Sequence, residues 1–314
     1  MKETMLITGA SGFLGEHLCR KYKDTYNVVA ISRNQKNLFQ LKNKLSGEIH
    51  VHPCDVSNIF ELEKVFYIHK PSIVIHAAAT KFVDWAELFP DECVNNNIIG
   101  SKNVLDLCMR YESKILIGVS TDKASPPIKN IYGLTKATME KLFTLSANDK
   151  LKVACVRYGN VLWSTGSVLP VWHDMYLDKK KILTTGPHMT RFFFTVDDAV
   201  NLIDFTLSSI DTVSGSIISK KMKVCKIESL LKAFCEVYGT EYEKEDVRPG
   251  ERDYEILVSE SEMDYTNELQ DGYLRLQINA RKPVEAHIES PYSTLNALEF
   301  SHEELVDMVK KNVF

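Results

Sequence analysis

The chain of 314 residues has few glycines, no disulfide pattern and no paired metal-binding cysteines. Only 14 residues are glycine, below the roughly 7% of average usage, so a cluster of glycines marks a place where the backbone needs them. The seven cysteines are odd in number and none form C-x-x-C. We therefore expect reduced, mostly buried thiols, and no disulfide framework or zinc site.

Other absences exclude whole classes of protein. No run of about 18 apolar residues is present, so no transmembrane helix is expected, and the first residues lack the apolar segment of a signal peptide. The net charge is −4 and basic blocks are missing, which argues against nucleic-acid binding. With 44% hydrophobic and 25% charged residues, the composition is typical of a globular protein, and we expect a cytoplasmic one without membrane or metal.

The first half alternates short apolar strands with amphipathic helices. Strands are expected at Met5–Ile7, Val28–Ile31, Ile49–His52, Ser72–His76, Ile115–Val119 and Val153–Val156. Helices are expected after the first strand through Tyr22, at Pro90–Arg110 and at Tyr132–Ala147. This alternation predicts βαβ units and an α/β fold with a doubly wound parallel sheet.

After about residue 160 the regularity fades. The stretch Trp163–Arg191 is rich in loops, and a strand and helix over Phe192–Leu207 are expected to return to the sheet. Shorter elements follow, with helices expected at Ile227–Tyr238 and His302–Lys311. We expect a dinucleotide-binding domain formed by residues 1–162 with about 192–210. A smaller substrate-binding cap is expected from residues 163–191 with 211–314.

A glycine-rich turn, Gly9-Ala10-Ser11-Gly12-Phe13-Leu14-Gly15, follows the first strand. Its glycines let the backbone turn sharply and approach a pyrophosphate, and the helix that follows supplies free N–H donors. A helix-capping turn without a ligand is the alternative. The residues expected to contact a dinucleotide here are Gly9, Ser11, Gly12, Phe13 and Leu14.

The end of the second strand indicates which dinucleotide would bind. An NAD site places Asp or Glu there, whereas this chain has Ser32 and Arg33, which suit a 2′-phosphate and favour NADP. The alternative is that Arg33 is a solvated surface cation. Further contacts to the dinucleotide, for some of which simple packing is the alternative, are expected from Asp55, Val56, Ala77, Ala78, Ala79, Tyr158, Gly159 and Val161.

Tyr132 and Lys136 form Y-x-x-x-K, which places both on one helical face, one turn apart. An ammonium beside a phenol stabilises the phenolate, which makes Tyr132 a candidate acid/base for a carbinol. A second match, Tyr176 with Lys180, lies in the loop-rich stretch. Tyr132, in contrast, follows Ser120-Thr121-Asp122-Lys123 at the carboxyl end of the fifth strand, where open α/β sheets bind ligands. A solvated, N-capped loop is the alternative for that segment.

Two arginines lie beside turn residues in the second half, in T-R-F at Arg191 and in R-P-G-E at Arg248. Arginine binds phosphate in a bidentate manner, so the pair suits the diphosphate and ribose of a sugar nucleotide. Structural ion pairs are the alternative for each.

Together these segments carry a resemblance. T-G-A-S-G-F-L-G with Y-G-L-T-K resembles the extended short-chain dehydrogenase/reductase superfamily, which has a Rossmann fold. S-T-D-K-A-S-P-P-I-K-N-I-Y-G-L-T-K, R-Y-G-N-V-L-W-S-T-G-S-V-L-P, M-T-R-F and R-P-G-E resemble the inverting UDP-N-acetylglucosamine 4,6-dehydratases. Those enzymes begin pseudaminic acid and related bacterial glycan pathways. The resemblance covers about residues 4–258, in the family's order.

The resemblance implies a role for each catalytic candidate. Tyr132, supported by Lys136, would deprotonate the sugar 4-hydroxyl as hydride leaves C4 for NADP. Lys123 would remove the C5 proton, and Asp122 would protonate the departing 6-hydroxyl, while Thr121 would hydrogen-bond the 4-oxygen. Hydride return to C6 and protonation on the opposite face of C5 would complete the inversion, with tightly bound NADP recycled in each turnover. Retaining relatives carry Glu where Lys123 stands.

The resemblance also implies contacts to a UDP-hexosamine from Lys81, Asn160, Ser167, Val168, Thr190, Arg191, Arg248 and Glu251. The chain departs from the family at Thr165, where Arg is usual, and in the run Arg252-Asp253-Tyr254-Glu255. The helices around 90–110 and 132–147 resemble a pair that forms a dimer interface, so a homo-oligomer is expected.

Other functions remain open at this point. Within the superfamily, a sugar-nucleotide 4-epimerase or a 5,6-dehydratase is an alternative. From another class, the chain would be a non-catalytic NADP-binding regulator on the same scaffold. Asp122 and Lys123 argue against simple epimerisation, which needs no C5 base, and Tyr132 with Lys136 argues against a regulator.

Overall fold

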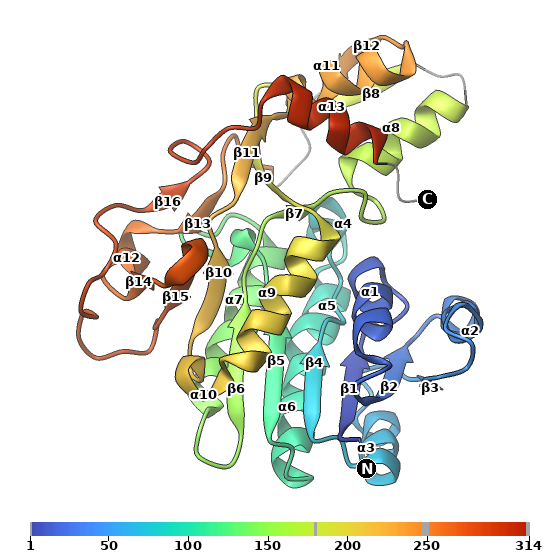
Figure 1. Ribbon diagram of the computed structural model, residues 1–314, viewed down its shortest axis with the longest axis vertical. Coiled ribbons are helices and arrows are strands. Elements are labelled where there is room, and N and C mark those ends of the chain that lie inside the picture. The colour runs from blue at the N-terminus through green and yellow to red at the C-terminus, as the bar shows by residue number, and fades with distance from the viewer. Residues whose placement is uncertain (1, 179–180, 246–250, 312–314) are drawn as a thin grey trace.

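The structure, a computed structural model, describes residues 2–178, 181–245 and 251–311. Its centre is a nine-stranded sheet that runs through the lower part of the molecule in Figure 1. The order across this sheet is β14 (Thr266–Glu268), β15 (Tyr273–Leu276), β10 (Ile217–Lys220), β6 (Lys152–Val156), β5 (Ile115–Val119), β4 (Ile73–His76), β1 (Thr4–Thr8), β2 (Asn27–Ser32) and β3 (His50–Pro53).

Strand β1 pairs in parallel with both β2 and β4, so the strand order reverses between β1 and β4. The middle of β1, Met5, Leu6 and Ile7, is fully buried. Such continuous apolar strands are expected where helices cover both faces of a sheet. In open α/β sheets the crevice at a reversal of strand order is where ligands bind. The expected doubly wound parallel sheet is confirmed.

Helices cover the two faces of this sheet. The contacts place α1 (Phe13–Tyr22) with α9 (Val196–Ser208) on one face, and α3 (Ile59–His69), α6 (Gly100–Arg110) and α7 (Ile131–Ser146) on the other. The helix α2 (Gln35–Lys44) joins β2 to β3. The long helix predicted over 90–110 is confirmed, with a π-helical segment in the middle, as α5 (Pro90–Val94), η1 (Asn95–Ile99) and α6, preceded by α4 (Val83–Leu88).

The upper elements in Figure 1 form a second, smaller core. Trp172 and Phe234 pack at its centre, with ring centroids 5.7 Å apart. Its helices are α8 (Val168–Leu177), α11 (Ile227–Tyr238) and α13 (His302–Lys310). Small sheets join β11 (Lys223–Lys226) to β9 (Thr190–Phe194) and β7 (Asn160–Val161), β12 (Tyr242–Glu245) to β8 (Ile182–Thr185), and β13 (Ile256–Val258) to β16 (Tyr292–Ser293). The remaining short elements are η2 (Asp122–Ala124), α10 (Ile210–Val213), α12 (Glu260–Met263) and η3 (Gln270–Gly272).

The predicted division of the chain differs from this arrangement in two places. Residues 211–314 were expected in the cap, but β10, β14 and β15 extend the central sheet beyond β6. Conversely, β9 was expected in the sheet and pairs instead with β7 and β11. Short strands carry no local signal of their partner, because pairing between distant segments depends on which sheet edge the rest of the fold leaves open.

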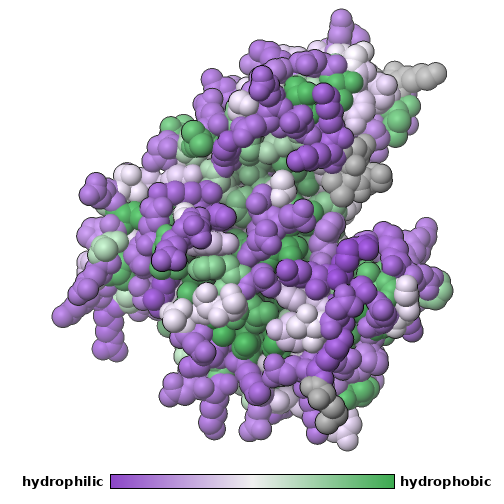
Figure 2. All heavy atoms as spheres, in the orientation of Figure 1, coloured by the Kyte–Doolittle hydropathy of each residue, from purple (hydrophilic) through white to green (hydrophobic). Residues whose placement is uncertain are grey.

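The surface and the thiols agree with the composition. Figure 2 shows a mostly hydrophilic face on which apolar side chains form small, interrupted patches. All seven cysteines are free, and six of them are buried, as predicted. Within the described ranges, no helix combines the length and the apolar character needed to cross a membrane.

A buried charge network ties strand β6 to helix α7 and to the β13–α12 segment. Arg157, at the end of β6, is 1% exposed, and its Nη2 lies 2.7 Å from Glu140 Oε2 on α7 and 2.9 Å from Glu262 Oε1 on α12. Its Nη1 donates to the Leu257 carbonyl of β13 at 3.0 Å. Burial raises the pKa of Glu262, but the nearby Arg157 charge outweighs this effect and the net shift is downward.

Replacing Arg157 tests how much this network contributes to stability. The change Arg157→Met leaves two carboxylates buried without their cation, so we expect the free energy of unfolding in urea to fall by about 3–5 kcal/mol. The control is Arg20→Met, which removes an exposed pair with Glu16 at 3.2 Å and is expected to cost at most about 1 kcal/mol. Equal losses in the two variants would contradict a structural role for the network.

Candidate active site

A cavity of about 1130 Å³ lies where the carboxyl ends of the parallel strands meet the upper elements. This volume exceeds the roughly 300–1,000 Å³ of a pocket for one small ligand, so it has room for two. Most predicted site residues line it: Gly9, Ser11, Gly12, Phe13, Leu14, Ser32, Arg33, Val56, Ala77, Ala78, Ala79, Lys81, Thr121, Lys123, Tyr132, Lys136, Tyr158, Gly159, Asn160, Val161, Ser167, Val168, Arg191 and Glu251.

Four predicted residues are not among the side chains that line the cavity. These are Asp55, Asp122 and Thr190, while Arg248 falls outside the described residues. The Asp55 carboxylate accepts hydrogen bonds from the backbone and hydroxyl of Ser57, at 2.9 and 2.8 Å, and so caps its own turn. The Thr190 hydroxyl lies 2.7 Å from the Thr294 hydroxyl, inside the cap.

Of the three glycines in the glycine-rich turn, two are required by the packing of the turn and the third lies on the cavity side. Gly9 has a φ of +66°, and a Cβ there would lie 2.8 Å from the Ala78 nitrogen. A Cβ at Gly15 would lie 2.4 Å from the Gly9 carbonyl oxygen. Both glycines are therefore required by the packing of the turn itself. At Gly12 the same atom would meet the Gly9 oxygen at 3.1 Å, a tight contact but a milder one than at Gly9 or Gly15, beside the helix N-terminus.

The end of the cavity near β2 carries both signs of charge. The hydroxyls of Ser11 and Ser32 lie 2.6 Å apart. Arg33 is half-exposed, and its Nη1 lies 3.9 Å from Asp55 Oδ2 and 3.8 Å from Glu92 Oε1. The guanidinium predicted to contact a 2′-phosphate is thus present, but two carboxylates already lie beside it.

Two buried polar groups near the middle of the cavity fit a ribose. Lys136 is 3% exposed, and its Nζ lies 3.3 Å from the thioether sulfur of Met139, which is a weak acceptor. Burial lowers the pKa of Lys136 to about 8. The Ser120 hydroxyl is buried without a hydrogen-bond partner. Buried donors usually have partners, so these two groups are suited to the hydroxyls of a bound dinucleotide.

The packing of α7 on the short turn η2 positions the predicted acid/base. Asn130 caps α7 by accepting a hydrogen bond from the Gly133 nitrogen at 2.7 Å. A Cβ at Gly133 would lie 2.2 Å from the Lys123 carbonyl oxygen, so only glycine allows this approach. The approach brings Tyr132 beside Thr121. Burial raises the pKa of Tyr132 to about 12, although the charge of Lys123 and a hydrogen bond with Thr121 both lower it.

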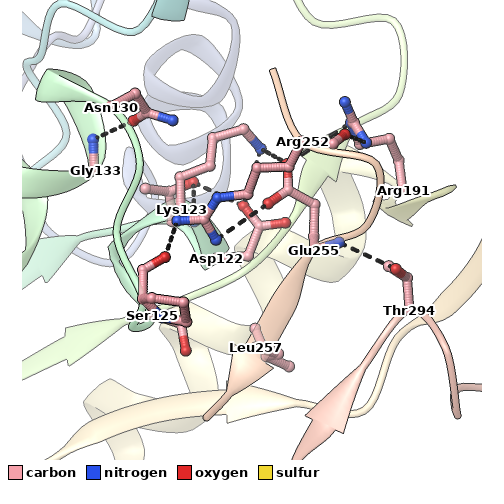
Figure 3. Close-up of polar contacts among 12 residues, drawn as sticks. Asp122, Lys123, Ser125, Asn130, Gly133, Arg191, Arg252, Glu255, Leu257 and Thr294 are labelled. Atoms are coloured by element: carbon pink, nitrogen blue, oxygen red, sulfur yellow. Dashed lines mark hydrogen bonds and ion pairs between the residues drawn. The ribbon is translucent and has the colours of Figure 1, made fainter. Parts of the chain in front are cut away.

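Lys123 lies at the centre of the polar cluster shown in Figure 3. Its Nζ lies 3.1 Å from Asp122 Oδ1, 3.2 Å from Glu255 Oε1 and 3.4 Å from Asn160 Oδ1. Burial lowers the pKa of Lys123, but the charges of Asp122 and Glu255 outweigh burial and raise it overall. A lysine in this state is an ammonium held between carboxylate partners.

Asp122 is fully buried behind Lys123 and Thr121. The Thr121 hydroxyl donates to Asp122 Oδ1 at 3.0 Å, and Asp122 Oδ2 has no hydrogen-bond partner. Asp122 therefore reaches the cavity through the hydroxyl of Thr121 and the ammonium of Lys123. The segment Thr121-Asp122-Lys123 lies beside Tyr132, as predicted. Asp122, however, is buried behind Thr121 and Lys123 and does not line the cavity where a substrate would bind.

The residues expected at the sugar nucleotide lie on the cap side of the cavity. Lys81 donates to the Thr165 carbonyl at 2.6 Å, across the cavity mouth. The Ser167 hydroxyl, at the start of α8, is buried and has no hydrogen-bond partner. The Arg191 Nη1 donates to the Arg252 carbonyl at 2.8 Å, which fixes its guanidinium in the wall. In the part of the chain that the structure describes, no group of three or more His, Cys, Asp or Glu side chains could hold a metal ion.

Glu255 and Arg252 also belong to this site, and the sequence reasoning gave them no role. Both are buried and both line the cavity, Glu255 at 1% exposure and Arg252 at 5%. Their run departs from the pattern of the resembling family, which was the one available signal. Their proximity to Lys123 comes from the fold, because the residues just before β13 pack on η2.

The Rossmann-type sheet, the glycine turn and the Tyr132–Lys136 helix together define a short-chain dehydrogenase/reductase fold, as expected. Within that class, the chain belongs to the family of polysaccharide biosynthesis proteins, whose model matches residues 5–277. This match covers most of the chain, including all the described residues that line the cavity.

Known proteins with related sequences or structures agree with this class. A UDP-glucose 4-epimerase of Rickettsia felis is 34% identical over 292 residues, which cover 89% of this chain and 84% of that protein. The X-ray structure of Pen from Bacillus thuringiensis has a TM-score of 0.90 at 26% identity, covering 99% of this chain and 98% of that one. A UDP-glucuronic acid 4-epimerase from Bacillus cereus, solved with UDP-glucuronic acid and NAD, shares the fold with a TM-score of 0.72 at 22% identity, over 80% of this chain and 88% of that one.

The position of Gly12 gives a direct test of dinucleotide binding. The change Gly12→Ala adds a methyl group on the cavity side, so we expect the Kd for the dinucleotide to rise by about tenfold or more with little loss of thermal stability. The control, Gly15→Ala, forces a methyl group onto backbone atoms and is expected to lower Tm instead. Calorimetric titration and thermal unfolding measure the two effects. Unchanged dinucleotide affinity in Gly12→Ala would contradict this placement.

Proposed function

We propose that this protein is a nucleotide-sugar-modifying enzyme that dehydrates UDP-N-acetylglucosamine to a UDP-2-acetamido-2,6-dideoxy-4-hexulose, with inversion at C5, for bacterial surface glycan synthesis. The observation that carries the proposal is the buried pair of Asp122 and Lys123 beside Tyr132, with Nζ and Oδ1 3.1 Å apart. Membership of the polysaccharide biosynthesis family supports the pathway class.

The second candidate is a nucleotide-sugar 4-epimerase, because relatives of this chain carry that name. Epimerisation at C4 needs one acid/base for the 4-hydroxyl, and Tyr132 would be sufficient. It gives no role to a lysine and an aspartate within hydrogen-bonding distance of each other. A dehydratase needs both a base for C5 and an acid for the leaving 6-hydroxyl, so the pair favours dehydration.

The first proposed step is oxidation at C4. Tyr132 accepts the proton of the sugar 4-hydroxyl, and Thr121 hydrogen-bonds the 4-oxygen. A nicotinamide dinucleotide would be held by Lys136, Ser120 and the glycine turn, in the part of the cavity that these residues line. When bound, that group supplies a hydride acceptor for C4, a hydride donor for C6 and a positive charge that favours the phenolate.

The next proposed steps are proton transfers by the pair. Moving one proton from the Lys123 ammonium to the Asp122 carboxylate produces an amine and a carboxylic acid at once. The amine then removes the C5 proton, which the C4 ketone has made acidic, and the acid protonates the departing 6-hydroxyl by way of Thr121. One water leaves, and a proton delivered to the opposite face of C5 inverts that centre.

The remaining cavity residues bind the substrate in this proposal. Arg191 and Lys81 contact the diphosphate, while Glu251 accepts hydrogen bonds from the ribose. Ser167 and Val168 place the N-terminus of α8 towards the phosphates, and a helix N-terminus favours anions. Asn160, already 3.4 Å from Lys123, orients the sugar ring.

We also propose a homo-oligomer. Large apolar side chains are exposed on helices α4, α6 and α7, among them Trp85 at 49%, Leu88 at 70%, Met109 at 47%, Leu134 at 49% and Leu145 at 62%. Exposed apolar side chains gathered on helices that pack together are typical of an interface. Sedimentation equilibrium tests this proposal, and a monomer at micromolar concentration would overturn it.

Isotope labelling tests the proposed reaction. Purified enzyme incubated with UDP-N-acetylglucosamine in deuterated water is expected to release one water and give a 4-keto-6-deoxy product with one solvent deuterium at C5, without added reductant. NMR of the product reads both the label and the C5 configuration. A retained configuration would exclude inversion, and a C4 epimer without loss of water would establish the second candidate.

The variant Lys123→Ala completes this test. It is expected to abolish dehydration while slow oxidation at C4 persists as absorbance of the bound reduced dinucleotide. The control Lys102→Ala changes an exposed lysine that pairs with Asp106 on the same helix and is expected to leave turnover unchanged. Wild-type turnover in Lys123→Ala would remove Lys123 from the mechanism.

NADP is the proposed dinucleotide, because Ser32 and Arg33 suit a 2′-phosphate. Loss of a charge-assisted hydrogen bond costs about 1.5–3 kcal/mol, so Arg33→Asp is expected to weaken NADP binding by roughly tenfold to a hundredfold while NAD binding changes little. Lys42→Asp, on the exposed side of α2, is the control. If Arg33→Asp and the wild-type protein bind NADP with equal affinity, the 2′-phosphate contact lies elsewhere. Asp55 and Glu92, which lie beside Arg33, would then favour NAD.

A further inference from the structure

Glu255 is a buried carboxylate that neither the sequence motifs nor the proposed reaction uses. It is 1% exposed, and its Oε1 lies 3.2 Å from Lys123 Nζ. Its Oε2 has no hydrogen-bond partner and is buried. Figure 3 shows its side chain between Lys123 and the two arginines, Arg191 and Arg252. A buried charge in such a place needs compensation, and its neighbours supply it.

The two carboxylates that flank Lys123, Asp122 and Glu255, differ in the number of positive charges that lie beside them. Glu255 has Arg191 Nε at 3.7 Å and Arg252 Nη1 at 3.9 Å, so two guanidiniums stabilise its negative charge. In its described contacts, Asp122 has the Thr121 hydroxyl at 3.0 Å and Lys123 itself. A proton that leaves the ammonium of Lys123 is therefore accepted by Asp122, because protonating Glu255 would leave both arginines without their shared anion.

We propose that Glu255 is a positioning residue that holds the Lys123 ammonium between two carboxylates and, through its arginine pair, directs the shared proton to Asp122. This inference rests on the proposed function for its catalytic meaning, since Lys123 and Asp122 are there the base and the acid. The contacts of Glu255 with Lys123 do not depend on which reaction the enzyme performs. The second carboxylate also fixes the direction of Nζ, which a lone partner would not.

The variant Glu255→Gln tests this role because it keeps the shape and removes the charge. Without that charge the Lys123 ammonium is less stabilised, so the pKa of Lys123 is expected to fall. The basic limb of the pH profile of kcat, where the pair loses its shared proton, should then move to lower pH. We expect kcat to drop by about tenfold and KM to change much less, since the lysine is no longer aimed at C5. The matched control is Asp253→Asn, an exposed carboxylate two residues away that pairs with His188.

A direct titration separates this inference from the proposed reaction. The full-length protein is labelled with ¹³C and ¹⁵N lysine, and the Lys123 signal is assigned with Lys123→Arg. Its titration is then compared among wild type, Glu255→Gln and Asp253→Asn, in the absence of substrate. A lower pKa in Glu255→Gln alone supports the role of Glu255. An unchanged titration in a folded Glu255→Gln overturns it, whatever the reaction.

The other outcomes are equally distinct. Wild-type enzyme that fails to dehydrate any UDP-hexosamine overturns the proposed function, while the titration still decides the role of Glu255. If Glu255→Gln does not fold, Glu255→Asp replaces it, because it keeps the charge at a shorter reach. That variant should keep the raised pKa of Lys123 and lose turnover, and wild-type turnover in Glu255→Asp overturns the positioning role.

Discussion

The buried ion pairs of Arg157 with Glu140 and Glu262 hold the parts of the active site in one frame. Arg157 directly follows strand β6, and the next residues, Tyr158, Gly159 and Asn160, line the cavity. Glu140 lies one turn beyond Lys136 on α7. Glu262 belongs to α12, just after the strand that follows Glu255. One guanidinium thereby connects the cavity end of β6, the catalytic helix and the segment that carries Glu255.

The same principle, charge held in the interior by opposite charge, organises the catalytic end of the cavity. Lys123 lies between Asp122 and Glu255, and Glu255 lies in turn between Lys123 and two arginines. Such a chain keeps every buried charge compensated while one proton moves within it. Lys136, in contrast, has the Met139 thioether 3.3 Å from its Nζ and is suited to a ligand that supplies oxygen acceptors.

The sequence predicted those parts of the fold and site that depend on local pattern. The apolar strands, the glycine turn and the Tyr132–Lys136 helix all depend on neighbours in the chain, and each lies where the sequence placed it. Prediction failed where distant segments meet. Strand β10 joins the sheet beside β6, and Glu255 reaches Lys123 through contacts that no local periodicity encodes. The depth of Asp122 also escaped prediction, because burial of one side chain in a polar run depends on the packing around it.

Proton removal from C5 is the central claim of this account, and one substrate tests it most directly. UDP-N-acetylglucosamine carrying deuterium at C5 is incubated with the enzyme in ordinary water, and the label is followed by NMR and mass spectrometry. We predict that every molecule of product has lost its C5 deuterium to solvent, in step with the loss of one water. Product that retains the deuterium at C5 would contradict the role given to Lys123 and its carboxylate partners.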